Sequence, residues 1–167
     1  LGDVYKRQDF DRPTEFELVT LLMFLYFDLK QVDIAIIEAG IGGRLDSTNV
    51  LSPELVICTS IGFDHTETLG NSLEEIAEHK AGVMQKNTPT LLGRVPEEVE
   101  QLFRQKSHEF KAPLAVIDRE IQLIHASNQT LQVSYGKWQS SKLKLSMLGQ
   151  HQENNAGLAV TAAHLLT

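Results

Sequence analysis

Residues 32–44 read VDIAIIEAGIGGR, a nearly continuous apolar run that ends in an acid and then a glycine-rich loop. The run, Val32–Ile37, is rich in β-branched residues and predicts a short strand buried on both faces of a parallel sheet. Glu38 follows it directly, and Gly40 to Arg44 form the loop. Ligands of parallel sheets bind beyond the carboxyl ends of the strands, so Glu38 stands where a functional acid is expected.

A second stretch repeats this arrangement. Leu55–Ile61 is another short apolar run and predicts a second buried strand, which ends at the tetrapeptide Gly62-Phe63-Asp64-His65. His65 therefore falls at the carboxyl end of its strand, as Glu38 does. The two strands together place an acid and a histidine at one edge of the predicted sheet.

Beyond these two stretches, helix and strand signals alternate along the chain. Ser72 and Glu75 have the spacing of a capping box, which predicts the start of a helix that ends near Gly82. The other signals are helical periodicity, proline near helix starts and short apolar runs. They predict helices over Pro13–Leu29, Ser72–Lys80, Pro96–Phe110 and from Gln150 onward, and strands over Thr90–Leu92 and Pro113–Ile117.

A different pattern occupies the segment that precedes Gln150. Short strand signals cluster there without intervening helices, at Ile121–Ile124, Leu131–Tyr135 and Lys142–Leu148, with Asn128-Gln129 and Tyr135-Gly136 as turns. Such clustering predicts a small antiparallel meander. The expected fold class is α/β, a mainly parallel sheet with flanking helices and an antiparallel addition.

Composition narrows the class of protein. Hydrophobic residues make up 42% of the 167 residues, enough for the core of one domain. The net charge of −7 argues against a non-specific nucleic-acid binder, which carries a basic face. No apolar segment reaches the length of about 18 residues that a membrane span needs. The single cysteine, Cys58, sits in an apolar run, so we expect an inert buried thiol and a reducing compartment.

The sequence starts and stops abruptly at the two ends of the chain. Residues 1–12 show no clear periodicity and do not begin with methionine, so we expect them to be non-native or irregular. At the other end, the apolar helical pattern Ala156–Leu166 stops without a capping glycine or a proline. The expectation is a fragment of a longer protein.

Taken alone, each candidate residue has an ordinary structural interpretation beside a functional one. Glu38 could hold Mg2+, which prefers oxygen ligands, or could cap a neighbouring helix. His65 could ligate a metal or contact a phosphate, or could be a histidine with no special role. Lys80 could react with carbonyl carbon if its pKa were lowered, or could be a favourable cation at a helix C-terminus.

The glycine-rich loop is equally open when it is considered alone. Its backbone amides could approach a phosphate or a carboxylate, because glycine adopts conformations that other residues avoid. The loop is not a P-loop, since no Gly-Lys-Ser/Thr follows, and its spacing differs from the Rossmann fingerprint. Arg44 and Asp46 could bind a substrate or could pair with each other.

Taken together, the motifs are more specific than any single residue. The string from Glu38 to Val50, EAGIGGRLDSTNV, resembles the folylpolyglutamate synthase/dihydrofolate synthase family of bacterial type, a branch of the Mur ligase superfamily. A second block agrees with it, namely Thr59 to Glu67, Leu69-Gly70, Ile76-Ala77 and Lys80-Ala81-Gly82. A third block, Gly149 to Gln152 with Asn155-Ala156, resembles the segment that ends the family's central domain.

The resemblance implies a role for each matching residue. Glu38 and His65 match magnesium ligands of the family. Lys80 matches a lysine that the superfamily carboxylates to a carbamate, so Lys80 and His65 are the implied catalytic residues. The implied binding residues are Asn155, which matches an asparagine near the adenine, and Arg44 and Asp46, which lie in a block that resembles part of the folate-side pocket.

The resemblance also implies a fold and a reaction. Residues 13–167 would be part of a P-loop-type Mur ligase central, ATP-binding domain that lacks the upstream P-loop and the C-terminal glutamate-ligase domain. The implied enzyme uses ATP and Mg2+ to add L-glutamate to a folate or dihydropteroate carboxylate through an acyl phosphate, in folate biosynthesis. It would be cytoplasmic and monomeric at full length, with no nucleic-acid or membrane partner, and this fragment would be inactive alone.

Other interpretations remain open at this point. The chain could come from another Mur-type amide ligase, such as a cell-wall enzyme, although the Gly-Gly-Arg-Leu-Asp block argues against this. It could instead be a non-catalytic remnant that binds nucleotide weakly or packs against a partner. The presence of Glu38, His65 and Lys80 argues against such degeneration. A metal-binding or regulatory module has little support beyond the acidic charge.

Overall fold

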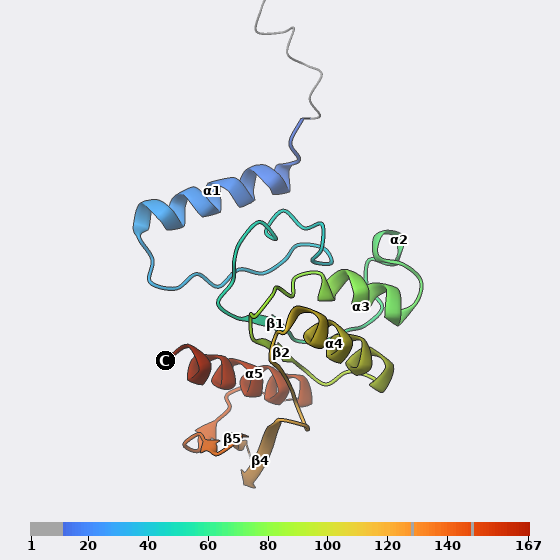
Figure 1. Cartoon of the computed structure of the whole chain (residues 1–167). Coiled ribbons are helices and arrows are strands. Elements are labelled where there is room, and N and C mark those ends of the chain that lie inside the picture. Colours follow the sequence, from blue (N-terminus) through green and yellow to red (C-terminus); the bar gives the residue numbers. More distant parts are fainter. Residues whose placement is uncertain (1–11, 128, 148) are drawn as a thin grey trace, which may run out of the picture.

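A computed structural model describes residues 12–127, 129–147 and 149–167 of the chain (Figure 1). The expectation for residues 1–12 lies outside these residues except at position 12. Among the described residues, no helix is long and apolar enough to cross a membrane. In chain order the elements are α1 (Glu15–Lys30), β1 (Val56–Cys58), α2 (Thr66–Leu69), α3 (Leu73–Ala81), β2 (Thr90–Leu92), α4 (Glu97–Phe110), β3 (Leu114–Val116), β4 (Ile121–Ser127), β5 (Thr130–Tyr135), β6 (Trp138–Gln139), β7 (Leu143–Lys144) and α5 (Gln150–Leu166).

The central feature is a parallel sheet of three short strands in the order β1-β2-β3. The strands pair in simple register, with Val56 opposite Thr90 and Thr90 opposite Leu114. Successive residues of a strand point to opposite faces, and β2 shows the consequence. Leu92 faces a core built with α3 and α4, whereas Leu91 faces a second core built with α5.

The second sheet is the antiparallel meander that the sequence predicts. Strand β5 pairs with β4, β6 and β7, and β4 and β5 pair along most of their length. Its apolar face packs against α5, since Leu131 and Val133 share a buried cluster with Leu158. The meander and α5 therefore cover one face of the parallel sheet, while α3 and α4 cover the other (Figure 1).

Most of the predicted elements are present, with small differences in their bounds. Strand β2 has the predicted bounds, and α4 and α5 begin within a residue of theirs. Ser72 caps α3 and forms the predicted capping box with Glu75. Of the strand expected over Lys142–Leu148, only β7 forms, and Leu148 lies outside the described residues, as does Asn128 of the first turn. The sequence analysis missed two short elements, α2 and β6.

The strand predicted over Val32–Ile37 is wrong. The segment has no regular secondary structure and pairs with no other strand of the described chain, and much of it faces solvent, with Ile36 93% exposed. An apolar β-branched run is typical of a buried strand, but a strand also needs a hydrogen-bonded neighbour. Glu38 consequently follows an irregular segment and does not lie at the end of a paired strand.

Helix α1 is the element with least contact to the two cores. Thr14 and Glu17 form a capping box at its start, although it is apolar around most of its surface. The ring of Phe16, a residue of α1, packs against Gly40. A Cβ added at Gly40 would lie 2.5 Å from that ring. Most of the other large apolar side chains of α1 are exposed. In Figure 1 the helix lies apart from the parallel sheet.

Candidate functional site

The carboxyl ends of β1 and β2 are joined by one side chain of α5. The amide of Asn154 donates a hydrogen bond to the carbonyl of Thr59 at 3.0 Å and accepts one from the backbone N–H of Arg94 at 3.1 Å. Gly93 allows this approach, because a Cβ there would lie 2.0 Å from the Thr59 carbonyl oxygen. Asn154 itself is only 8% exposed, and both of its hydrogen bonds are partly buried.

An ion pair joins the end of β3 to the end of β2. The guanidinium of Arg94 donates two hydrogen bonds to the carboxylate of Asp118, which follows β3. These bonds lower the pKa of Asp118, against the opposing effect of partial burial. The edge of the sheet where parallel-sheet ligands bind is thus braced across all three strands.

His65 lies on the loop that leaves β1. It is the N-cap residue of α2 and takes a left-handed backbone conformation, with φ 48° and ψ 41°. Its backbone N–H donates to Asp64 Oδ1 at 2.9 Å, and its Nε2 lies 3.7 Å from Asp64 Oδ2. The side chain is 48% exposed, so the imidazole is accessible to a ligand.

The glycine-rich loop is organised around Asp46. One carboxylate oxygen accepts the backbone N–H groups of Gly40 and Ile41, and the other accepts the N–H and the hydroxyl of Thr48. Partial burial raises the pKa of Asp46, but the hydrogen bonds from Thr48, Ile41 and Gly40 outweigh it, so the pKa lies below its ordinary value. In the described part of the chain, Asp46 and Arg44 do not form the ion pair that the sequence left open.

The same loop is attached to the C-terminal end of α3. The backbone N–H of Arg44 donates to the carbonyl of His79 at 3.0 Å, and the side chain of Asn49 donates to the carbonyl of Gly82 at 3.2 Å. Gly82 has no room for a Cβ because Arg44 lies against it. The bond from Asn49 satisfies a carbonyl at the helix end, and the His79 carbonyl, which also accepts the N–H of Gly82, gains a second donor.

Lys80 lies in the last turn of α3, immediately beside this attachment, and is half-buried. Its charge also reaches the core: burial raises the pKa of the Cys58 thiol to about 11, and the positive charge of Lys80 opposes that rise. Cys58 is therefore protonated at neutral pH and unsuited to be a nucleophile, as the sequence predicts.

Glu38 is exposed and precedes the loop that Asp46 holds. Within the described residues its carboxylate makes no hydrogen bond or ion pair, so both oxygens are free for a ligand. No group of three or more His, Cys, Asp or Glu side chains in the described ranges is arranged to hold a metal ion. Glu38 and His65 could still supply two ligands to Mg2+, which keeps several water molecules in protein sites.

Asn155 is exposed on α5 next to the buried Asn154. The sequence analysis singled out Asn155 and missed Asn154, and it also missed the Arg94–Asp118 pair. A signal for Asn154 exists, because asparagine is a poor helix former and two in succession near a helix start indicate specific hydrogen bonds.

These features agree with comparisons to known proteins. Residues 6–163 match the Mur ligase middle domain, and the chain belongs to this family. It is 37% identical over 165 residues to a protein of Bacillus subtilis (strain 168) named dihydrofolate synthase/folylpolyglutamate synthase, covering 95% of this chain and 38% of that protein. The resemblance to the folylpolyglutamate synthase branch that the sequence suggested is confirmed.

Solved structures give the same result for the fold. The apo form of L. casei FPGS superposes with a TM-score of 0.87 at 29% identity, over 98% of this chain and 41% of that one. An FPGS–AMPPCP–folate complex superposes with a TM-score of 0.87 at 28% identity, over 98% of this chain and 41% of that one. The expected fold class is confirmed, and the chain spans about two fifths of the length of the relatives it matches.

Proposed function

We propose that this chain is the central, ATP-binding part of a ligase that adds L-glutamate to the carboxylate of a folate or dihydropteroate. The observation that carries the proposal is the similarity over 95% of the chain to a dihydrofolate synthase/folylpolyglutamate synthase. The fold likeness to an FPGS that binds AMPPCP and folate supports the same substrates. Residues 13–167 belong to that central domain in this proposal, within a monomeric cytoplasmic enzyme that has no nucleic-acid or membrane partner.

The proposed residues divide into a metal side and a substrate side. Glu38 and His65 would hold Mg2+, and this is compatible with an exposed carboxylate that has no partner among the described residues and with an accessible imidazole. Lys80 acts from the end of α3, where a carbamate on its amine would place a negative charge. Bound Mg2+ would supply charge neutralisation at the transferring phosphoryl group.

On the substrate side, three residues contribute in different ways. Asn155 lies exposed on α5 and is assigned to the adenine. Arg44 is exposed on the glycine-rich loop and is available to an anionic folate. Asp46 belongs to the same pocket through the loop that it holds, because its carboxylate oxygens are already occupied.

The chemistry is formation of an amide in two steps. The γ-phosphoryl group of ATP passes to a carboxylate oxygen of the folate or dihydropteroate, and ADP leaves. The amine of glutamate then attacks the acyl carbon of this acyl phosphate, and phosphate leaves with the amine giving up a proton. Positioning and electrostatic stabilisation dominate such transfers, which suits a site that offers oxygen and imidazole groups and a buried, unreactive thiol.

A chimera tests the proposal. We would replace the matching segment of the B. subtilis relative by these 167 residues and measure ATP-dependent incorporation of labelled glutamate into dihydropteroate and tetrahydrofolate. A UDP-muramyl peptide in the substrate panel distinguishes another Mur-type ligase. We expect activity with one or both pterin substrates, and no turnover by the isolated chain.

Substitutions in the active chimera assign the residues. Lys80→Ala and Glu38→Gln should each lower kcat by about 100-fold or more, as expected for groups that stabilise the transition state. Lys137→Ala is the matched control, because Lys137 is exposed in the turn before β6, far along the chain from the site. A well-folded chimera without ligase activity on any pterin would overturn the proposed function, and a fully active Lys80→Ala variant would overturn the role of that lysine.

A further inference from the structure

The geometry points to Asp46 as a positioning residue, whose carboxylate holds the loop that follows Glu38 and thereby fixes Glu38 relative to Lys80 on α3. The roles of Glu38 and Lys80 in this inference rest on the proposed function. The contacts of Asp46 are independent of it. The family resemblance places Asp46 in the substrate pocket. Its hydrogen bonds, however, are all made within its own loop.

The carboxylate of Asp46 is fully used. An ionised carboxylate offers about four acceptor sites, and four donors reach this one. Their distances are 2.8 Å from Gly40 N–H, 2.9 Å from Ile41 N–H, 2.9 Å from Thr48 N–H and 2.6 Å from the Thr48 hydroxyl. Hydrogen bonds to an ionised acceptor are stronger than neutral ones, so the loop is closed firmly at this residue.

The loop has two ends to connect. At its start, the N–H groups of Gly40 and Ile41 lie just after Glu38, so holding them fixes where the backbone delivers the Glu38 side chain. At its other end, Arg44 and Asn49 are bonded to carbonyls of α3 at His79 and Gly82. Lys80 sits between these two attachment points on the helix.

A carboxylate is needed at this position because both of its oxygens accept. An asparagine of the same shape has one oxygen and one NH2 group, and the NH2 group would face either Gly40 and Ile41 or Thr48, donor against donor. Asp46→Asn therefore breaks one side of the closure with little change in volume. Thr48→Val is a milder change, since it removes the hydroxyl and leaves the bonds to Gly40 and Ile41.

The experiment uses the 15N-labelled chain and Mn2+, which like Mg2+ is suited by carboxylate and water ligands. Amide exchange rates are measured by NMR at Gly40, Ile41, Arg44 and Thr48, and Mn2+ is titrated while the broadening of the Glu38 and His65 amides is followed. In Asp46→Asn we expect exchange to rise by about tenfold or more on the side that the new NH2 group faces, either at Gly40 and Ile41 or at Thr48, since the amides there lose their acceptor.

The Mn2+ titration distinguishes a positioning role of Asp46 from a general effect of the residue on the stability of the fold. We expect the Mn2+ concentration for half-broadening at Glu38 to rise by about 10- to 100-fold in Asp46→Asn, the range for residues that orient metal ligands. Thr48→Val should give a smaller rise. Glu120→Gln is the matched control, because Glu120 also accepts a backbone N–H and a guanidinium but braces a turn after β3, and it should leave the titration unchanged.

Each outcome decides something different. A wild-type chain that shows no Mn2+ broadening at Glu38 would overturn the metal assignment of the proposed function, and the role of Asp46 with it. If Glu38 responds in the wild type and equally in Asp46→Asn, the positioning role is wrong while the metal assignment stands. Unchanged exchange at Gly40, Ile41 and Thr48 together would also overturn it. Circular dichroism of each variant verifies that the fold is kept.

Discussion

Asn154 lies on α5, yet both polar ends of its side chain contact backbone atoms at the ends of β1 and β2. The side chain therefore ties a C-terminal helix to two strand ends that are distant along the chain. If it is removed, the carbonyl of Thr59 and the N–H of Arg94 lose partners in a partly buried region. A fully buried polar group without a partner costs about 1–3 kcal/mol, and a partly buried one costs less.

The first prediction concerns this residue. Asn154→Ala should lower the free energy of unfolding by about 1–3 kcal/mol, since the buried amide is lost and two partly buried backbone groups lose their partners. The measurement is urea denaturation followed by circular dichroism. Asn155→Ala is the natural control, because its side chain is exposed, and it should change the stability by no more than about 0.5 kcal/mol. Equal effects of the two substitutions would show that the hydrogen bonds of Asn154 do not stabilise the packing of α5 against the ends of β1 and β2.

The second prediction concerns Cys58. Burial raises its thiol pKa to about 11 from 9.0, with Lys80 opposing the rise. The native thiol should therefore react slowly with a thiol reagent at pH 8, and at an ordinary rate once the chain is unfolded in urea. The raised pKa also favours the folded state at low pH. That contribution is fully present below pH 9.0 and is lost as the pH rises toward about 11.

The pH dependence has its own control. Cys58→Ala should remove the part of the stability loss between pH 9.0 and about 11 that this thiol causes. Denaturation curves of both chains across that range provide the measurement. Fast modification of the native thiol at pH 8 would show that Cys58 is not held in the core as described.

At this scale the sequence predicts candidate residues but not what each of them contacts. Glu38, His65 and Lys80 are candidates because they fall within motifs of defined spacing. Asp46 is a candidate for the same reason, but its contacts inside the loop depend on the fold of Gly40 to Thr48, which spacing does not reveal. Asn154 went unnoticed because its partners lie 95 and 60 residues away in the chain.

At the scale of the elements, the close contact between the ends of β1 and β2 leaves no room for a side chain. Gly93 follows β2, and a Cβ at this position would lie 2.0 Å from the backbone oxygen of Thr59 and 2.7 Å from the side chain of Asn154. Backbone atoms cannot move aside as a flexible side chain can. The strand ends are therefore spaced for glycine alone.

The third prediction follows from that spacing. Gly93→Ala should destabilise the chain by about 3 kcal/mol, because the added methyl group must push two strand ends apart. Gly62→Ala offers a matched control on the loop after β1, where an added Cβ has nothing within 4 Å, and should stay within about 0.5 kcal/mol. Thermal unfolding of both variants measures the difference, and a harmless Gly93→Ala would show that the two ends can separate.

Element prediction worked where the signal is local and failed where it is not. The capping box of Ser72 and Glu75 and the periodicity of α4 and α5 depend on neighbours in sequence, and all three helices were predicted. The segment Val32–Ile37 has the composition of a buried strand, but pairing depends on a partner elsewhere in the chain. Composition alone could not tell a paired strand from an irregular segment.

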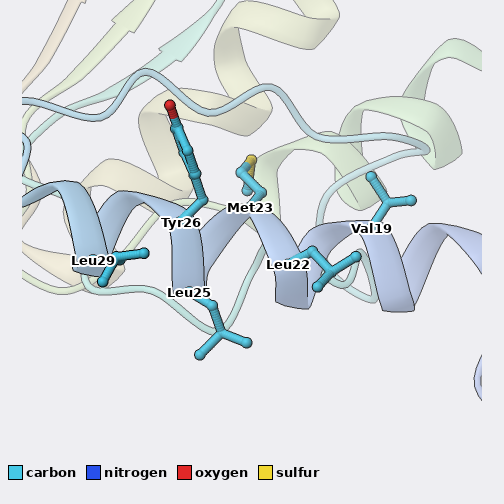
Figure 2. Close-up of a pocket in the computed structure, with 6 residues that line it drawn as sticks. All are labelled: Val19, Leu22, Met23, Leu25, Tyr26 and Leu29. Carbon is cyan, nitrogen blue, oxygen red and sulfur yellow. The ribbon is translucent and has the colours of Figure 1, made fainter.

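For the whole molecule, the outstanding surface feature of the described residues is α1, which exposes apolar side chains around most of its circumference. Figure 2 shows six apolar side chains of this helix, which project from it in more than one direction. Leu22, Leu25 and Leu29 are 63%, 57% and 78% exposed. A contiguous apolar surface of this kind is unusual for a soluble monomer and promotes association.

The fourth prediction is that the isolated chain associates through α1. Sedimentation velocity at increasing concentration should show weight-average mass rising above that of one chain, accompanied by binding of an apolar dye. The double substitution Leu22→Lys and Leu25→Glu should abolish both effects and leave the unfolding free energy within about 1 kcal/mol, since these side chains bury little in the fold. A wild-type chain that stays monomeric at all concentrations would contradict the prediction.

The strand order of the parallel sheet has a consequence for how this molecule is made. The strands pair in the order β1-β2-β3, which is also the order in which a ribosome releases them. Each new strand meets a partner that is already outside the exit tunnel, so no strand pairing within residues 56–116 waits for a segment released later. Nascent chains can therefore assemble this sheet vectorially, before α5 emerges and before Asn154 fastens its edge.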